Sequence, residues 1–210
     1  REIERLQSIY TVQFFKQELE AQFVQFAGLV YPDFFHAKHV IQLQPETQFK
    51  YNLAGTDPGF ANPAAILVVG VDVDNRYTVR EEWFETGKTG DEIILAAARL
   101  HARYKIDSFA CDPSSASLIE DARRKGVAFK AANNDVRAGI NKVTELLRTG
   151  RLHVNEECKN LIREFNSYAY PDPKAGAAMN ENPIKVDDHC LDALRYCLIG
   201  AEPKRRLAIA

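Results

Sequence analysis

Between residues 48 and 132 the chain passes from three consecutive β-forming segments to an alternation of helix and strand patterns. The three segments are QFKYNLAGT, AAILVVGVDV and RYTVREEWFE, separated by turn signals at Pro58-Gly59 and Asp74-Asn75. Short turns between consecutive strands predict an antiparallel meander. This pattern restricts the possible folds more than any other feature of the sequence.

Helices and strands alternate after the meander. Thr89 and Glu92 have the spacing of an N-terminal capping box, so a helix is expected to begin there. IDSFAC then predicts a buried strand, SASLIEDARRKG a helix, VAFKAA a strand and VRAGINKVTELLRTG a helix. RLHVNEECKNLIREFNSYAY predicts a short strand and a helix, and a last helix is expected from about Val186 to Ile199. Such alternation adds parallel strands to the meander.

The expected fold class is therefore α/β. Three strands followed by alternating helices and strands, closed by a terminal helix, have the order of a ribonuclease H-like fold, a mixed five-stranded sheet flanked by helices. Residues 46–210 form this expected domain. Residues 1–45 differ, with a helix or extended arm at 13–26 and the aromatic segment GLVYPDFF, and we interpret them as an N-terminal connector. The loop at 174–183 is either a regulatory flap or a flexible connection.

Composition limits the class of protein. Of all residues 46% are hydrophobic, enough to bury a core, and no stretch approaches the ~20 apolar residues of a membrane span. We expect a cytoplasmic domain without membrane contact.

The four cysteines lack CxxC spacing, which favours buried thiols. Structural zinc on Cys158, Cys190 and His189 is an alternative without the usual ligand spacing. Because the chain begins at Arg1 and its single methionine is Met179, we expect a fragment of a longer polypeptide.

Acidic residues stand at three places where this fold would hold a side chain rigidly and expose it. Asp57 lies at the end of the first strand, between Gly55 and Gly59, which leave little bulk to block a ligand. Asp112 ends the strand IDSFAC, and the last helix carries the cluster Asp187, Asp188, His189 and Asp192. The alternatives are that Asp57 only starts a turn and that Asp112 only caps the next helix.

The cluster in the last helix needs the most explanation. Asp188 and Asp192 would lie about 40° apart around the helix, with His189 about 60° beyond Asp192. Apolar residues would occupy the opposite side. Two carboxylates at this spacing destabilise a helix by roughly 0.2–0.5 kcal/mol, and a bound divalent cation would remove the repulsion. The helix dipole offers another explanation for Asp187 and Asp188, but not for Asp192.

Oxygen ligands without paired cysteines favour Mg²⁺ or Mn²⁺ over zinc. Two such ions roughly 4 Å apart can activate water and stabilise the leaving oxygen of a phosphodiester. In this scheme Asp57 bridges the ions, Asp112 and Asp192 each complete one ligand shell, and Asp188 is a further candidate ligand. His189 is a candidate ligand, a residue that orients water, or a support for a ligand. We therefore expect a metal-dependent nuclease whose catalytic residues are Asp57, Asp112, Asp192 and His189.

Charge is unevenly distributed along the chain. Residues 51–121 hold six Lys and Arg against twelve Asp and Glu, and residues 122–163 hold ten against four. This division suits a cation-binding centre beside a phosphate-binding surface, although solvated basic helix faces are an alternative. Phosphate contacts would make DNA binding weaken steeply with salt. The candidate DNA-binding residues are Arg123, Arg124, Lys125, Arg137, Lys142, Arg148 and Arg151.

The ordered motifs AGTDPG, ACDPSS, DVRAGINKV, RLHVNEECKNLIREFNSYAY and DDHCLDALRY resemble those of the C-terminal nuclease domain of the large terminase subunit of tailed bacteriophages. ELEAQFVQFAGLVYPDFF resembles the segment that follows the ATPase motor of those proteins, with Ala21 where relatives often have Gly. The resemblance covers nearly the whole chain. It implies that Asp57, Asp112 and Asp192 bind divalent metal, with Asp188 and His189 as auxiliary residues.

The resemblance also implies an activity and partners. Members of this family cut double-stranded concatemeric DNA during genome packaging, which would place this protein in the cytoplasm of an infected bacterium. The implied partners are the portal protein and the small terminase subunit, and an ATPase domain would precede residues 1–45. Two alternatives remain: another ribonuclease H-like nuclease such as a Holliday-junction resolvase, and an actin-like ATPase. The first would lack the GLVYPDFF and NLIREFNSYAY segments, and the second needs a duplicated domain.

Overall fold

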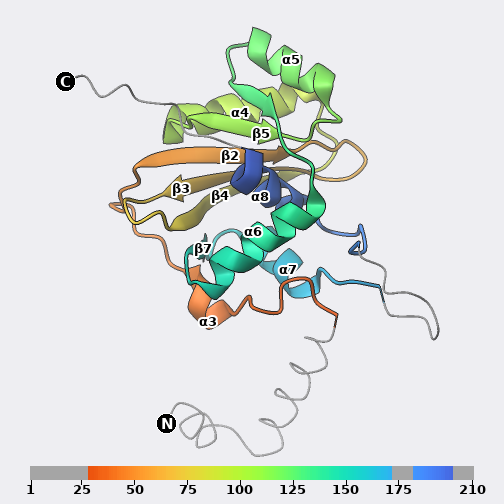
Figure 1. The fold of residues 1–210 in the computed structure, drawn as a ribbon. Helices are drawn as coiled ribbons and strands as arrows, with labels where there is room; N and C mark the ends of the chain where they lie inside the picture. The colour runs from red at the N-terminus through yellow and green to blue at the C-terminus, as the bar shows by residue number, and fades with distance from the viewer. Residues whose placement is uncertain (1–27, 172–181, 201–210) are drawn as a thin grey trace, which may run out of the picture.

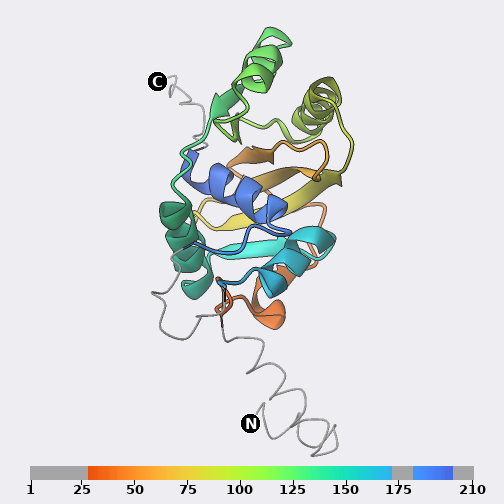
Figure 2. The same cartoon turned by 90° about the vertical axis from the view of Figure 1, so that its right-hand side faces the viewer.

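The computed structural model describes residues 28–171 and 182–200 (Figure 1). A mixed seven-stranded sheet with the order β1-β7-β4-β3-β2-β5-β6 forms its centre. Helices lie on both faces of the sheet, as the view turned by 90° also shows (Figure 2). The α/β class and the mixed sheet predicted from the sequence are confirmed.

The predicted meander consists of β2 (Tyr51–Asp57), β3 (Ala64–Val71) and β4 (Tyr77–Glu85), paired antiparallel. Every residue of β3 is buried. Its Leu67 belongs to one hydrophobic core and its Ile66 and Val68 to another, because successive side chains of a strand point to opposite faces. The centre of the sheet is therefore covered on both sides.

Parallel strands extend the meander on one side. β5 (Ser108–Cys111) pairs parallel with β2, and β6 (Phe129–Ala131) pairs parallel with β5. The register places Thr56 opposite Cys111. β2 and β5 consequently end at the same edge of the sheet, and the residues that come next in the chain lie side by side there.

The sheet has seven strands rather than the five expected. β7 (Leu152–Asn155) pairs parallel with β4, and β1 (Val40–Ile41) pairs parallel with β7. β7 is the short strand expected near residue 152, which the count of five had left outside the sheet. β1 has only two residues, too few to show an alternating pattern.

Residues 28–45, the described part of the expected connector, pack on this domain. Val30, Tyr31 and Phe34 are buried in the same core as Phe165, and the short helix α3 (His36–His39) leads into β1. The boundary at residue 46 stays a prediction. The helix or arm expected at 13–26 and most of the loop at 174–183 lie outside the described residues.

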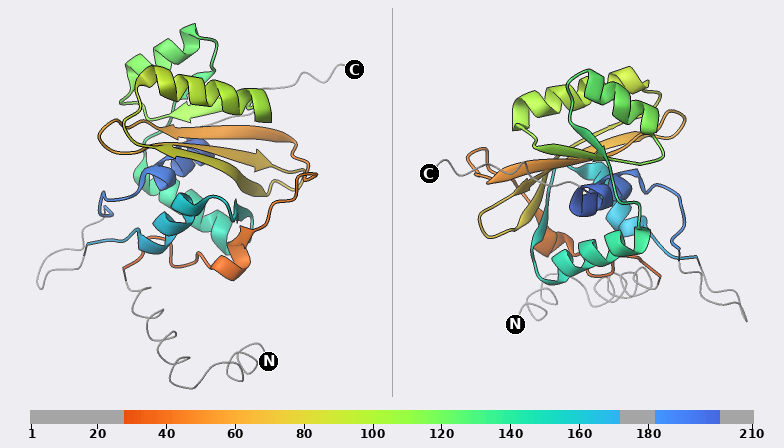
Figure 3. Two further views of the ribbon diagram at one scale, coloured as in Figure 1. Left: turned by 180° about the vertical axis from the view of Figure 1, so that it is seen from behind. Right: turned by 45° about the horizontal axis from the view of Figure 1, so that its top comes forward.

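Two groups of helices cover the sheet (Figure 3). On one face lie α4 (Gly90–Tyr104) and α5 (Ala116–Arg124), and on the other α6 (Val136–Arg148), α7 (Lys159–Ser167) and α8 (His189–Gly200). The predicted capping box of α4 is present, with Thr89 and Glu92 each accepting the other's backbone N–H. Among these helices none is long and apolar enough to cross a membrane.

The helix α8 differs from its prediction. It begins at His189, and all its residues from Cys190 to Cys197 are buried, so an apolar face opposite a solvated anionic face is wrong. The reason is that α8 packs on β2, β3 and β5 while α6 and α7 also contact it. A Cβ on Gly55 would lie 1.8 Å from the Ala193 carbonyl oxygen. Gly55 therefore lets α8 approach β2, rather than clearing space for a ligand.

Candidate metal-dependent active site

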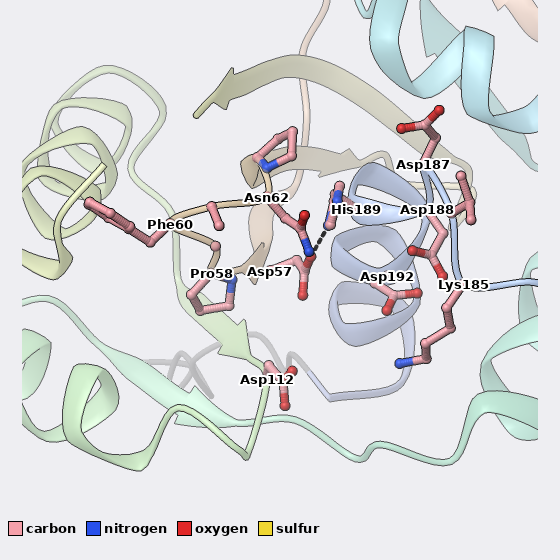
Figure 4. Close-up of a pocket in the computed structure, with 14 residues that line it drawn as sticks. Asp57, Pro58, Phe60, Asn62, Asp112, Lys185, Asp187, Asp188, His189 and Asp192 are labelled. Carbon is pink, nitrogen blue, oxygen red and sulfur yellow. Dashed lines mark hydrogen bonds and ion pairs between the residues drawn. The ribbon is translucent and has the colours of Figure 1, made fainter. Parts of the chain in front are cut away.

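A pocket of about 540 Å³ lies at the edge of the sheet where β2 ends, between the loop that follows β2 and the segment that enters α8 (Figure 4). The structure brings to it all the acids and the histidine that the sequence predicted, although Asp57 and His189 are 132 residues apart in the chain. Its charged and titratable lining residues are Asp57, Asp112, Lys185, Asp187, Asp188, His189 and Asp192.

Asp57 is the last residue of β2, and its carboxylate is largely buried. Its Oδ2 accepts a hydrogen bond from His189 Nδ1 at 2.9 Å. Burial raises the pKa of Asp57, the His189 hydrogen bond lowers it, and the charges of Asp112 and Asp188 raise it further. Burial and the two neighbouring aspartates therefore oppose the ionisation of Asp57, while His189 favours it. The alternative that Asp57 only starts a turn does not explain its bond to His189.

Asp112 follows β5 and lies beside the end of β2. Its backbone N–H donates to the Thr56 carbonyl oxygen at 3.2 Å, which extends the pairing of the two strands by one residue. Its Oδ1 accepts from the Ser114 N–H at 2.9 Å and closes a turn, whereas the N-cap of α5 is Ser115. Asp112 is therefore not the N-cap of α5. Its side chain lines the pocket (Figure 4).

The three aspartates near the start of α8 have different surroundings. Asp187 is exposed and has a φ of 51°, which makes it a turn residue. Asp188 directly precedes the helix, and its carbonyl oxygen accepts from the Asp192 N–H at 2.8 Å. The Oδ2 of Asp188 is buried and has no hydrogen-bond partner among the described residues. Such an oxygen is costly to bury unless a ligand satisfies it.

Sequence reasoning missed Arg195, which forms a buried ion pair with Asp192. The guanidinium also donates to the Tyr168 hydroxyl at 3.3 Å. Burial raises the pKa of Asp192 to about 7, although Arg195 lowers it, while Asp188 and Asp57 raise it. The spacing of three residues between Asp192 and Arg195 suits an ion pair on one helix, and this signal was available in the sequence.

Glu164 is a second residue that the sequence analysis missed. It lies on α7, fully buried, and its Oε2 accepts from the Leu191 N–H in the first turn of α8 at 2.9 Å. The N–H groups of a first helical turn lack partners within the helix, so Glu164 satisfies one of them. Burial raises the pKa of Glu164 to about 7, although the hydrogen bond from Leu191 lowers it. The signal available in the sequence was a single glutamate at a position of the helix pattern where an apolar residue is expected.

The residues of the pocket fit a hard divalent cation in ligand chemistry, since they offer carboxylate oxygens. As placed, no three His, Cys, Asp or Glu side chains of the described ranges converge closely enough to hold an ion. Asp57 and Asp192 are instead held by His189 and Arg195. The Oδ2 of Asp188 has no partner among the described residues, and the charges of Asp188 and Asp57 help to raise the pKa of Asp192. A cation bound here would satisfy the oxygen and offset these charges.

The zinc alternative has no support in the described residues. Cys158 and Cys190 are buried in the hydrophobic core as free thiols, while His189 bonds to Asp57 at the pocket. All four cysteines are buried, as expected for reduced thiols in a core.

The structure divides the predicted DNA-binding residues between the two faces of the sheet. Buried residues of α5 belong to the core shared with α4, and those of α6 belong to the core shared with α7 and α8. Hydrogen bonds to carboxylates or carbonyl oxygens of the chain are made by Arg123, Arg124, Lys125, Lys142, Arg148 and Arg151. Arg137 also interacts with other residues. Because α5 and α6 pack on opposite faces of the sheet, these residues come from both faces, and their contact with DNA stays a prediction.

Comparison with known proteins gives matches along most of the chain. The model of the Terminase RNaseH-like domain family matches residues 54–200. The large terminase subunit of Escherichia phage T5 is 27% identical over 205 residues, which cover 93% of this chain and 47% of that protein. The chain thus spans about half the length of this curated relative.

Solved structures are also similar. The large terminase of a thermophilic bacteriophage has 29% sequence identity and a TM-score of 0.75, covering 81% of this chain and 45% of that one. The large terminase nuclease domain of bacteriophage SPP1, solved with bound Mn, has 19% identity and a TM-score of 0.60, covering 76% and 95% of the two chains. This second likeness shows the fold. Since the family model matches well over half of its residues, the chain belongs to the Terminase RNaseH-like domain family, as its ordered motifs predicted.

Proposed function

We propose that this domain is a divalent metal-dependent endonuclease that cuts double-stranded DNA during the packaging of a tailed bacteriophage genome. The observation that carries the proposal is that Asp57, Asp112, Asp188 and Asp192 line one pocket at the edge of the sheet. Family membership supports the packaging role, and the Mn bound to the SPP1 nuclease domain supports the class of metal. Concatemeric DNA as substrate, the portal protein and small terminase subunit as partners, and the infected bacterial cytoplasm as the site of action belong to the same proposal.

The four aspartates would supply the oxygen ligands for two Mg²⁺ or Mn²⁺ ions. Bound ions of this kind lower the pKa of water and stabilise the leaving oxygen of a phosphodiester. The protein's own contribution is to place the ligands. Asp57 stands at the end of a fully paired strand and Asp112 at the end of its parallel neighbour, so the backbone fixes both positions.

His189 and Arg195 orient the ligand side chains. His189 donates to one oxygen of Asp57, which fixes the plane of that carboxylate. Arg195 holds one oxygen of Asp192 against α8. Glu164 in turn holds the start of α8, the element that carries both His189 and Asp192. Ligands supported in this way lose little conformational freedom when an ion binds.

A plasmid assay tests this proposal. We expect the purified domain to nick or linearise plasmid DNA with Mn²⁺ or Mg²⁺, without strong sequence preference, and to stop when EDTA is added. Asp57→Asn and Asp192→Asn should each lower the rate by at least about 100-fold and weaken Mn²⁺ binding measured by calorimetry. The control is Asp107→Asn, which lies at the other end of β5 from Asp112. Full activity in Asp57→Asn would overturn the assignment.

The alternatives predict other results. A Holliday-junction resolvase would cut four-way junctions in strong preference to linear duplex. An actin-like ATPase would hydrolyse ATP and leave plasmid DNA intact. The match of residues 54–200 to one terminase domain family favours neither.

A further inference from the structure

Lys185 is the only lysine or arginine among the described residues that line the acidic pocket. It lies in the segment that enters α8, and its side chain is exposed. In Figure 4 the ammonium end extends into the space between Asp112 and Asp192. Five aspartates share the same lining, so one cation stands among many anions.

The backbone around Lys185 is anchored, although its side chain is not. The Ile184 N–H donates to the Ala169 carbonyl oxygen at 2.9 Å, and the Val186 N–H donates to the Ile184 carbonyl oxygen at 3.0 Å. These bonds fix where the lysine leaves the chain. Within the described ranges Lys185 forms no ion pair, whereas Lys125 and Lys142 pair with carboxylates. The Lys185 ammonium therefore has no structural partner there that it must leave to contact a ligand.

A phosphodiester carries a negative charge, and five aspartates repel it. Metal ions bound to the carboxylates would offset part of that repulsion. A lysine at the rim provides protein charge as well, because its ammonium is a compact cation with three hydrogen-bond donors on a flexible stem. Burial raises the pKa of Asp192 to about 7 and Lys185 is among the groups that lower it, which places the ammonium within electrostatic range of the acids.

We propose that Lys185 binds a phosphate of the DNA strand that enters the acidic pocket and so positions the phosphodiester over the aspartates. This inference rests on the proposed nuclease function. It assigns Lys185 to the substrate and the four aspartates to the metal. The competing interpretation is that Lys185 only neutralises Asp192.

The two interpretations differ in what the removal of the lysine does. If Lys185 contacts a phosphate, Lys185→Ala removes one cation from the DNA-binding surface. The slope of log K against log salt for duplex binding then falls in magnitude by about 0.9, and KM rises more than kcat falls. Mn²⁺ affinity stays the same or increases, because a positive charge has left the neighbourhood of the ion. If Lys185 only neutralises Asp192, the salt slope and KM keep their wild-type values, even where Mn²⁺ affinity increases.

The experiment compares wild type, Lys185→Ala, Lys185→Arg and Lys50→Ala. Lys50 is an exposed lysine just before β2, at the opposite end of that strand from Asp57. Duplex affinity is measured by fluorescence anisotropy at several salt concentrations with Ca²⁺, with the integrity of the duplex checked on a gel. Mn²⁺ affinity is measured by calorimetry without DNA. We expect the smaller slope only in Lys185→Ala, with Lys185→Arg and Lys50→Ala close to wild type.

The experiment distinguishes failure of the Lys185 proposal from failure of the proposed nuclease function. If wild type cuts plasmid with Mn²⁺ while Lys185→Ala keeps the wild-type salt slope and KM, the phosphate-binding role of Lys185 is overturned and the nuclease function stands. If wild type fails to bind Mn²⁺ and to cut DNA, the proposed function itself is overturned, and the inference on Lys185 falls with it.

Discussion

His189 Nδ1 lies 2.9 Å from Asp57 Oδ2, so the first residue of α8 holds the last residue of β2. The hydrogen bond with Asp57 raises the pKa of His189, while burial lowers it. The pair therefore links the position of the helix to the orientation of a proposed metal ligand.

Replacing His189 should weaken the site without unfolding the protein. His189→Ala leaves Asp57 free to rotate, and the loss of such a supporting partner typically costs roughly 10–100-fold in metal affinity or activity. We expect a decrease of this size in Mn²⁺ affinity by calorimetry and in the rate of plasmid cleavage. The control is His36→Ala, an exposed histidine on α3. Wild-type affinity and rate in His189→Ala would show that Asp57 needs no partner.

Arg195→Met should destabilise the fold, because it leaves the Asp192 carboxylate buried without its cation. Removing one partner of a buried ion pair typically costs about 3–5 kcal/mol. Urea unfolding at neutral pH, in EDTA, measures this loss. The double variant Asp192→Asn/Arg195→Met should regain part of the stability, since neither charge is then left alone. If the loss of unfolding free energy in the double variant equals the sum of the losses in the two single variants, Asp192 and Arg195 are not coupled.

The positions of Asp57 and Asp112 could be predicted because parallel strands end at one edge of a sheet, and the register Thr56–Cys111 confirms this. The surroundings of Asp192 could not be predicted in the same way. Charges at the start of α8 suggested a solvated face, but α6 and α7 cover the helix. The cation that makes this burial possible is Arg195, and its role depends on tertiary packing.

The basic stretch shows another limit of sequence reasoning. A count of charges along the chain does not reveal their partners, some of which lie far away in sequence. Lys125 pairs with Asp91, 34 residues away, and Arg148 with Asp33, 115 residues away. The two-residue strand β1 was missed for a related reason, since only its pairing with β7 identifies it.

Gly55→Ala should be more harmful than a glycine substitution in an open turn. The new methyl group would lie 1.8 Å from the Ala193 carbonyl oxygen and 2.9 Å from Cys197 Cβ, so α8 must move away from β2. Overpacking of this kind costs about 1–3 kcal/mol or more, and the movement also displaces His189 from Asp57. We expect a lower unfolding free energy together with a lower cleavage rate.

Gly87→Ala is the matched control for Gly55→Ala. Gly87 has a φ of +72° and open space where a Cβ would lie. The substitution strains the backbone by about 1–2 kcal/mol, and its methyl group would have no atom within 4 Å. The Gly87 N–H, which donates to the Phe60 carbonyl oxygen in the pocket loop, is kept in alanine. Urea unfolding should show a loss in both variants, whereas plasmid cleavage of the folded protein should decrease only in Gly55→Ala. Equal cleavage by the two variants would mean that the contact between α8 and β2 does not determine the geometry of the active site.

The buried Glu164 makes stability depend on pH. Burial raises its pKa from 4.5 to about 7, although the Leu191 hydrogen bond opposes this. Between these two values the folded state keeps a proton that the unfolded state releases. The folded state then binds more protons, so the unfolding free energy falls as pH rises through this window. Asp192, whose pKa burial also raises to about 7, contributes with the same sign.

Glu164→Gln should remove the part of this decline that belongs to Glu164. The amide does not titrate, yet its oxygen can still accept from the Leu191 N–H that Glu164 Oε2 now satisfies. We expect the variant to lose on the order of 3 kcal/mol less than wild type between pH 4.5 and pH 8, measured by urea unfolding in EDTA. Glu157→Gln, an exposed residue just before α7, should follow the wild-type profile. A full wild-type decline in Glu164→Gln would show that Glu164 is already ionised in the folded protein at pH 5, because its replacement would then leave the difference in bound protons unchanged.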